Sequence, residues 1–217
     1  MHLSTEARYW KRATRATATL IQIYDARGCE QFSSVLKKII HSKSRWQFLY
    51  DTWKKHGGRG DPDFIKSDAP PDFVPPIRAG HETTTDSASP RGVFATRDIQ
   101  KGEMIYGHTK NYAYFASGRS FERFLEDLSD IEACDFITFA TPQSNFGPNG
   151  ETAIVSIMDD FSLMKNGGAD ANSGCLEGKD CTVDKYALRD IKEGEEIFCD
   201  CSKFLPQQHG WEQFGLM

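Results

Sequence analysis

Apolar side chains recur at helical spacing from the N-terminus to about residue 56. The pattern predicts three consecutive helices with these apolar positions: Tyr9, Ala13, Ala16, Leu20, Ile23 and Tyr24; then Phe32, Val35, Leu36, Ile39 and Ile40; then Trp46, Phe48, Leu49, Tyr50 and Trp53. Gly28 is expected to end the first helix, and Gly57, Gly58 and Gly60 follow the third. Residues 1–60 are therefore interpreted as a helical N-terminal extension, which either packs as a bundle against the main domain or forms a separate docking module.

Proline then interrupts the pattern. Residues 61–88 contain five prolines among acidic residues, followed by a tract rich in Ser and Thr. Such a segment is expected to lack long regular structure, because proline donates no backbone hydrogen bond and fixes φ. We interpret it as a linker, or as a loop that runs along the main domain.

Residues 107–150 alternate between two kinds of pattern. Phe121, Phe124, Leu125 and Leu128 form an amphipathic stretch typical of a helix, whereas the run 136–139 (FITF) favours a strand. A glycine- and asparagine-rich turn at 145–150 leads into another predicted strand over residues 152–157.

A twelve-residue pattern occurs twice, as FATRDIQKGEMI at 94–105 and YALRDIKEGEEI at 186–197. Each copy predicts a strand, a polar turn and a second strand, with Gly102 or Gly194 free to take a positive φ in the turn. Taken alone, the two copies are similar hairpins that carry no chemistry.

Three further segments accompany this repeat. Residues 90–92 (PRG) precede the first copy, residues 164–172 (MKNGGADAN) precede the second, and residues 198–201 (FCDC) follow it. In order and spacing these segments resemble the SET domain, the fold of protein lysine methyltransferases. That family opens on Gly-x-Gly with a Val-Phe-Ala strand, carries Asn-His-Ser-Cys-x-Pro-Asn in mid-domain and closes on Gly-Glu-Glu-Leu-x-Tyr-Asp-Tyr. The resemblance covers residues 89–204, about half of the chain.

This resemblance implies a mainly β (α+β) fold of several small twisted sheets with a C-terminal pseudoknot. Residues 89–204 would form the SET-like domain, with a variable insertion at 107–150 and a C-terminal tail at 205–217. Asn172 and Asp200 would reinforce the pseudoknot.

The resemblance also implies a cofactor and a reaction. The cofactor would be S-adenosylmethionine, and a methyl group would pass to an uncharged lysine amine. The positions that match the family's cofactor-binding motifs are Arg91, Gly92, Asn166 and Gly167. Phe204, Trp211 and Phe214 are candidates by position for the apolar wall against adenine, or they simply anchor the C-terminus.

Several positions depart from the family pattern. Pro90 replaces the first glycine, Gly167 and Gly168 replace His and Ser, and Ala171 replaces Pro. Cys199 and Cys201 replace the closing tyrosines, and Cys201 stands at the catalytic one.

A thiol is shorter than a phenol and donates a hydrogen bond weakly. Either another aromatic such as Tyr106, Tyr112 or Tyr114 fills the gap, or turnover is slow or absent. Our first hypothesis is thus a S-adenosylmethionine-dependent protein-lysine methyltransferase; the alternative is a catalytically silent SET-like module that binds a basic peptide or protein partner. A SET member that modifies a non-histone protein is a third hypothesis.

The net charge of −5 is unevenly distributed, since residues 1–60 carry +8 and residues 61–217 carry −13. An acidic main domain suits a basic, lysine-containing peptide or protein substrate and argues against contact with a phosphate backbone, so no nucleic acid is expected there. No apolar stretch reaches the length of about 20 residues that crosses a bilayer, so we expect a soluble protein with no membrane contact. The oligomeric state is left open.

The six cysteines occur without a secretory signal pattern. This favours reduced thiols and a nuclear or cytoplasmic protein, with a plastid kept open because Ala, Thr and Arg dominate residues 7–19. Cys175, Cys181, Cys199 and Cys201 could ligate zinc, but the Cys-x-Cys-x4-Cys run of zinc-binding relatives is missing. We expect no metal and interpret the cysteines as small buried hydrophobic residues.

Overall fold

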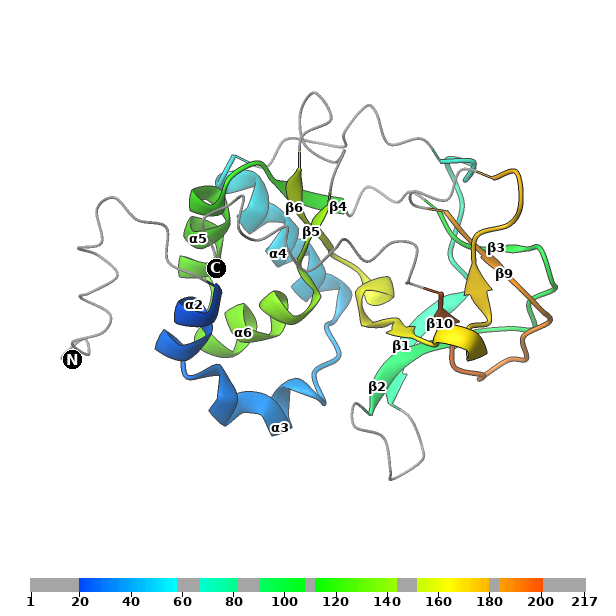
Figure 1. Ribbon diagram of the computed structural model, residues 1–217, viewed down its shortest axis with the longest axis horizontal. Coiled ribbons are helices and arrows are strands. Elements are labelled where there is room, and N and C mark those ends of the chain that lie inside the picture. Colours follow the sequence, from blue (N-terminus) through cyan, green and yellow to red (C-terminus); the bar gives the residue numbers. More distant parts are fainter. Residues whose placement is uncertain are drawn as a thin grey trace.

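The computed structural model describes residues 20–57, 67–81, 90–107, 112–143, 152–179 and 184–200 (Figure 1). Its helices are α2 (Leu20–Ala26), η1 (Cys29–Phe32), α3 (Ser33–Leu36), α4 (Lys43–Lys55), α5 (Gly118–Glu126), α6 (Asp130–Phe139), η3 (Asp160–Leu163) and η4 (Gly168–Asp170). Its strands are β1 (Ile77–His81), β2 (Arg91–Ala95), β3 (Met104–Tyr106), β4 (Tyr112–Phe115), β5 (Thr141–Gln143), β6 (Ala153–Ile157), β7 (Lys165–Asn166), β8 (Ser173–Gly174), β9 (Lys185–Ala187) and β10 (Phe198–Cys199).

The described strands form three small sheets, in the orders β1-β2, β3-β9-β8-β10-β7 and β4-β6-β5. Helices α2 to α6 gather around β4-β6-β5 at one end of the molecule, and the other two sheets lie at the opposite end (Figure 1). The predicted fold class, several small sheets together with a helical N-terminal region, is confirmed.

The N-terminal helices follow the sequence pattern in part. Helix α2 is followed by Gly28 at φ 64°, as predicted, and its predicted beginning lies outside the described residues. The second predicted helix is wrong: the chain makes two four-residue pieces, η1 and α3, and Val35 on its supposed apolar face is 46% exposed. The third is confirmed as α4, which begins after the N-cap Ser42 and is followed by Gly57 at φ 86°.

Helix α4 belongs to the main hydrophobic core. Trp53 is fully buried, and its indole N–H donates to the carbonyl of Tyr114 on β4 at 2.8 Å. The centre of this core is Phe115, whose ring lies 5.1 Å from Phe121 and Phe124 on α5. The helical extension is therefore packed against the main domain, which is the first of the two predicted alternatives.

Helix α6 corrects the strand predicted at 136–139. The helix begins with a capping box in which the Ser129 hydroxyl accepts from the backbone of Glu132, and the Glu132 carboxylate accepts from the backbone of Ser129. This start signal lies seven residues before Phe136, and once the helix has begun, Phe136 and Ile137 are buried within it. The helix predicted around Phe121 and the strand predicted at 152–157 are confirmed as α5 and β6.

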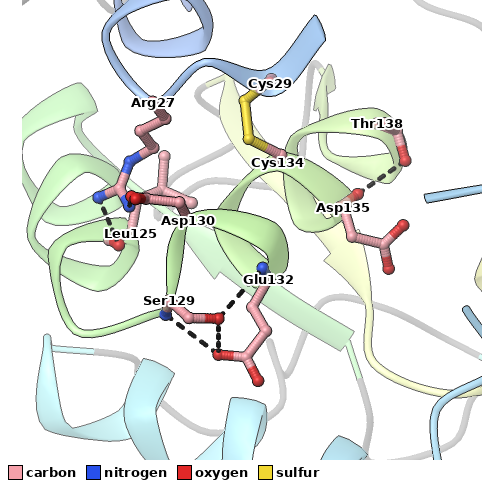
Figure 2. Close-up of a disulfide and its surroundings, with 9 residues drawn as sticks. All are labelled: Arg27, Cys29, Leu125, Ser129, Asp130, Glu132, Cys134, Asp135 and Thr138. Atoms are coloured by element: carbon pink, nitrogen blue, oxygen red, sulfur yellow. Dashed lines mark hydrogen bonds and ion pairs between the residues drawn. A yellow bond between two sulfur atoms is a disulfide. The ribbon is translucent and has the colours of Figure 1, made fainter. Parts of the chain in front are cut away.

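A disulfide between Cys29 and Cys134 ties η1 to α6 (Figure 2). Both sulfurs are fully buried, and the two residues are 105 positions apart in the sequence. Arg27, two residues before Cys29, reinforces the contact by binding Asp130 at 3.1 Å and the Leu125 carbonyl at 2.7 Å. The prediction of reduced thiols is therefore wrong for this pair, and it is wrong for Cys175 and Cys199 as well, because both are disulfide-bonded.

Part of the predicted linker belongs to a sheet. Strand β1 pairs with β2 along its whole length, from Ile77 opposite Ala95 to His81 opposite Arg91. Prolines 75 and 76 stand just before the strand, where the missing N–H groups cost no ladder hydrogen bond.

The two copies of the twelve-residue pattern pair with each other instead of folding into separate hairpins. Gly102 donates to the Ala187 carbonyl at 2.8 Å, and its counterpart Gly194 donates to the Ala95 carbonyl at 2.9 Å. Both glycines have a positive φ, 84° and 80°, as predicted. The side chains at three matching positions form one small core: Ala95, Ile99 and Ile105 with Ala187, Ile191 and Ile197. The repeat is thus a pseudo-symmetric pair, and the prediction that each copy forms a hairpin is wrong.

Strand β10 has the position expected of a pseudoknot. It runs parallel to both β7 and β8 and lies between them in the sheet. Since residues 167–172 connect β7 to β8, the C-terminal strand passes beneath that connection.

Candidate functional site

A pocket of about 220 Å³ lies where the sheets of the two ends meet. We call it the Tyr112 pocket. Its walls come from five parts of the chain and consist of Tyr112, Thr138, Phe139, Thr141, Gln143, Val155, Ser156, Ile157, Phe161, Ser162, Met164, Lys185 and Cys199. Pockets for whole small-molecule ligands usually measure about 300–1,000 Å³. The Tyr112 pocket is therefore sized for a side chain.

Tyr112 is the pocket's phenol. It opens strand β4 opposite Ile157 of β6 and is 5% exposed. Burial, together with the negative charges of Asp159 and Asp184, raises the pKa of the Tyr112 hydroxyl far above its usual value of about 10. The hydroxyl is thus neutral at physiological pH and able both to donate and to accept a hydrogen bond.

Lys185 and Cys199 complete the inner wall. Lys185 is 5% exposed, and its ammonium donates to the Asp184 carbonyl at 3.3 Å. The Asp184 carboxylate accepts hydrogen bonds from the Ser67 hydroxyl at 2.5 Å and from the backbone of Asp68 at 2.7 Å, which docks the segment before β1 at this place. Cys199 is 1% exposed and disulfide-bonded, so its sulfur offers no thiol.

The other two candidate tyrosines lie elsewhere. Tyr106 stacks on Phe161 with ring centroids 3.8 Å apart, and its hydroxyl donates to Asp159 at 3.0 Å. Tyr114 lies against Trp53, with ring centroids 6.0 Å apart. Of the predicted substitutes for the closing tyrosine, only Tyr112 lines the pocket that also contains Cys199.

The Arg91 side chain binds helix α6 and lies away from residues 90–92, which we call the glycine turn. Its guanidinium donates to the fully buried Asp135 of α6 at 2.6 Å, and His41 bonds the other oxygen of the same carboxylate at 2.8 Å. This buried network fixes the start of β2 against α6. The Arg91 side chain is therefore part of the structural framework, and only its backbone remains for the predicted cofactor contact.

Gly92 lies close to residues 164–172, which we call the asparagine loop, and Glu196 contacts both. A Cβ on Gly92 would overlap the Oε1 atom of Glu196, and the same oxygen binds the Lys165 ammonium at 2.8 Å. The close approach of two strands accounts for a glycine at position 92. Residues 90–92 and 164–172 therefore lie side by side.

The asparagine loop surrounds the C-terminal strand. The Gly167 N–H donates to the Cys199 carbonyl at 2.9 Å, and a Cβ on Gly167 would lie 2.6 Å from the Cβ of Phe198. Asn172 is fully buried; its side chain donates to the Glu196 carbonyl at 2.8 Å and accepts from the Phe198 N–H at 2.8 Å. The predicted structural role of Asn172 is confirmed.

The polar groups of this loop bond mainly within the structure. Asn166 is exposed, and its side-chain oxygen accepts from the Gly168 N–H at 3.2 Å. The Gly167 N–H donates to the Cys199 carbonyl, and the Gly167 carbonyl accepts from the Asp170 N–H at 2.9 Å. Cys201, Phe204, Trp211 and Phe214, also predicted to act here, lie outside the described residues, as does Cys181.

Three pocket residues had no signal in the sequence. Thr138, Ser156 and Lys185 lie on different elements, and none belongs to a motif. Ser156 is 1% exposed, and among the described residues its hydroxyl has no hydrogen-bond partner. Among the same residues, no three His, Cys, Asp or Glu side chains gather as a metal-ligand group. No helix in the described ranges has the length and apolar character needed to cross a bilayer.

Comparison with known proteins agrees with this architecture. The SET domain model matches residues 90–202, which is just over half of the chain, so the chain belongs to the SET domain family. No curated protein matches the chain.

Two solved structures match part of the chain at low similarity. One is a Plasmodium falciparum protein described as a histone methyltransferase, with 16% identity and a TM-score of 0.34, covering 58% of this chain and 93% of that one. The other is a chain of apo ctPRC2 with mutations in Ezh2, with 19% identity and a TM-score of 0.38. It covers 62% of this chain, which in turn spans 16% of its length.

Proposed function

We propose that this protein is a S-adenosylmethionine-dependent protein-lysine N-methyltransferase, and that the substrate lysine enters the Tyr112 pocket. The observation that carries the proposal is the buried, neutral Tyr112 hydroxyl. It lies in a pocket sized for a side chain, which Cys199 of strand β10 also lines. The acidic charge of residues 61–217 supports a basic peptide or protein as substrate.

The Tyr112 hydroxyl would bind the amine of the substrate lysine. A neutral phenol can accept from an N–H of the amine and so orient its lone pair along one direction. Such positioning supplies much of the acceleration in a displacement reaction. In this role Tyr112 stands in for the hydroxyl that the family's closing tyrosine provides.

Lys185 would help to keep the substrate amine uncharged. A buried ammonium in the same pocket disfavours a second positive charge and so lowers the pKa of the incoming lysine. Only the uncharged amine has the lone pair that the reaction requires. The carboxylates of Asp159 and Asp184 act in the opposite direction, but neither residue lines the pocket, whereas Lys185 does.

The residues suited to the cofactor are the backbone of Arg91 and Gly92 and the exposed Asn166. S-adenosylmethionine, when bound, supplies the methyl group on an electron-poor sulfur. Pro90 lacks an N–H and so removes one contact that the family's first glycine makes. We therefore expect weak cofactor binding and slow turnover.

The alternative is a SET-like module that binds a basic peptide without catalysis. The observation in its favour is Cys199, which is disulfide-bonded and offers neither a hydroxyl nor a thiol to a ligand. We favour the enzyme over this alternative, because Tyr112 on strand β4 provides a phenol where the closing tyrosines of the family are replaced by cysteines.

The test combines calorimetry with a methyl-transfer assay. Wild-type protein, Tyr112→Phe and the matched variant Tyr24→Phe are titrated with S-adenosylmethionine and then incubated with the radiolabelled cofactor and lysine-rich peptides. We expect cofactor binding in all three, and about 10–100-fold less transfer in Tyr112→Phe alone, because a hydrogen bond to the reacting amine is lost. Peptide binding without cofactor binding at millimolar concentration would establish the silent module instead.

A further inference from the structure

A second pocket, of about 360 Å³, lies between α4, the segment before β1, and η3. We call it the Trp46 pocket. Its walls are formed by Lys43, Trp46, Gln47, Tyr50, Val74, Pro75, Ile77, Tyr106, Met158, Asp159, Asp160 and Phe161. The four residues from α4 recur at spacings of three or four and so share one face of that helix. None of the motifs of the sequence accounts for this pocket.

The walls combine aromatic rings with carboxylates. The indole N–H of Trp46 donates to Asp160 at 3.2 Å, and the hydroxyl of Tyr106 donates to Asp159 at 3.0 Å. The polar ends of these two aromatic side chains are therefore engaged with the wall itself. Their rings, the ring of Tyr50 and the remaining lone pairs of the two carboxylates are what the wall presents to a ligand.

Asp159 and Asp160 are held in place by backbone groups as well. Asp159 caps η3 by accepting from the Phe161 N–H at 2.9 Å, and Asp160 accepts from the Ala79 N–H of β1 at 2.9 Å. Each carboxylate thus accepts hydrogen bonds from neutral donors, which keep its orientation.

Two lysines lie near this charge. Lys43 lines the pocket, and the ammonium of Lys54 lies 4.4 Å from the centroid of the Tyr50 ring. Both lysines are exposed, whereas Asp159 and Asp160 are half-buried, so solvent screens the lysines more than the carboxylates. The Lys54 contact also shows that the Tyr50 ring attracts an ammonium group.

We propose that the Trp46 pocket binds the ammonium-bearing side chain of a basic peptide, a lysine in its unmodified or N-methylated form. An aromatic ring attracts a cation through the negative charge of its face, and an ammonium group that leaves water needs anionic or aromatic partners on several sides. The pocket has four aromatic residues and two oriented carboxylates in its walls, and it offers an anion only Lys43 and Gln47. A phosphate or nucleotide would be repelled by the two carboxylates, so the pocket favours a cationic ligand over an anionic one.

The Trp46 pocket adjoins the Tyr112 pocket. Phe161 lines both of them, and the charge of Asp159, in the wall of the first, contributes to the raised pKa of Tyr112 in the second. One peptide with two basic residues would therefore be held at two places. The binding itself requires neither the cofactor nor methyl transfer, so this inference stands independently of the proposed function.

The test measures binding of three peptides without cofactor. They are identical ten-residue peptides whose single central residue is lysine, N-trimethyllysine or glutamine, titrated by calorimetry into the full chain. We expect both cationic peptides to bind about tenfold more tightly than the glutamine peptide, which corresponds to one desolvated cation–π contact. Equal affinity for all three would overturn the inference.

Two variants locate the site. Tyr50→Leu removes one ring but keeps an apolar side chain, and it is expected to reduce the affinity for the trimethyllysine peptide about fivefold to tenfold while the glutamine peptide is unaffected. Phe48→Ala removes an aromatic ring that lies on α4 outside this pocket and is 41% exposed, so it serves as the matched control. An equal loss in Phe48→Ala would contradict the assignment.

Tyr112→Phe separates this proposal from the proposed function. It should retain the preference for the trimethyllysine peptide over the glutamine peptide, because a trimethylammonium group has no N–H to donate to the Tyr112 hydroxyl. Loss of the preference in Tyr112→Phe, with Tyr50→Leu unchanged, would place the ammonium in the Tyr112 pocket and overturn the inference. The indole N–H of Trp46 donates to Asp160 in the wall of the pocket, so its NMR signal reports on binding there. The signal is assigned with the variant Trp46→Phe. It should shift on addition of the trimethyllysine peptide and stay in place with the glutamine peptide.

Discussion

Ile99 and Ile191 exchange both of their backbone hydrogen bonds, each 2.9 Å long, at the centre of the paired repeats. They occupy the same position in the two copies, and each side chain is 1% exposed. Around them the side-chain contacts repeat as well: Asp98 accepts from the Glu193 N–H at 3.0 Å, as Asp190 accepts from the Lys101 N–H at 2.9 Å. The similarity between the copies therefore reflects the contact that they make with each other.

Ile191→Ala is expected to destabilise the protein by about 2–5 kcal/mol, because it leaves a cavity between the two copies. The free energy of unfolding in urea measures the loss. Val35→Ala, at a position that is 46% exposed, is the matched control and should change it little. A loss no greater than that of the control would show that the repeats do not share one core.

Removal of the Cys29–Cys134 disulfide should lower the free energy of unfolding by about 2–5 kcal/mol, since the bond closes a long loop of the unfolded chain. The double variant Cys29→Ala with Cys134→Ala keeps the site apolar and tests this bond alone. Its unfolding is compared with that of the wild type under oxidising conditions. Equal stability there would mean that the bond does not form in solution.

Gly167→Ala should destabilise the pseudoknot. The new methyl group would lie 2.6 Å from the Cβ of Phe198 and 3.0 Å from the Ala171 backbone, and overpacking of this kind costs about 1–3 kcal/mol. Gly178→Ala is a control in an open turn, where only the positive φ of 77° is strained. If Gly167→Ala is neutral, the loop is wider than the structure shows. The family's histidine at this position should likewise be tolerated poorly.

Tyr112 should make stability depend on pH in the alkaline range. Burial raises the pKa of its hydroxyl, so the folded state keeps the proton when the unfolded chain begins to lose it at about pH 10. The stabilisation is complete below that pH and is lost as the pH rises further. Unfolding midpoints between pH 8 and 11.5 should therefore fall less steeply in Tyr112→Phe than in the wild type. Parallel curves would show that the hydroxyl is not buried.

Lys185→Met should shift the pH dependence of kcat/KM for methyl transfer to higher pH. Without the ammonium in the pocket, the substrate lysine keeps a pKa nearer to its usual value of about 10.4, so the uncharged amine is reached only under more alkaline conditions. Lys179→Met removes an exposed lysine outside the pocket and is the control. An unchanged profile in Lys185→Met would remove this role for Lys185.

The sequence predicted those elements whose signals are local. Helix α4 carries its apolar face and its flanking glycine in one stretch, and β6 is a run of β-branched and small residues between polar ones. The strand predicted at 136–139 was wrong because its aromatic and β-branched residues outweighed the capping box seven residues earlier. The disulfide could not be read from spacing, since its cysteines meet only after η1 and α6 have packed together.

The site was predictable only where a motif marked it. Asn172, Gly92 and the closeness of their two segments followed from the order of the motifs. Tyr112 could be named as a candidate but not separated from Tyr106 and Tyr114, because strand pairing decides which phenol reaches Cys199. Lys185 lies between motifs and has no pattern of its own; its role depends on the pocket that the fold assembles.

The place of β10 has a consequence for shortened forms of the chain. Phe198 and Cys199 form the fourth of five strands in their sheet, with a strand on either side. A truncation that reaches Phe198 would remove the strand between β8 and β7 and so divide the sheet through its interior.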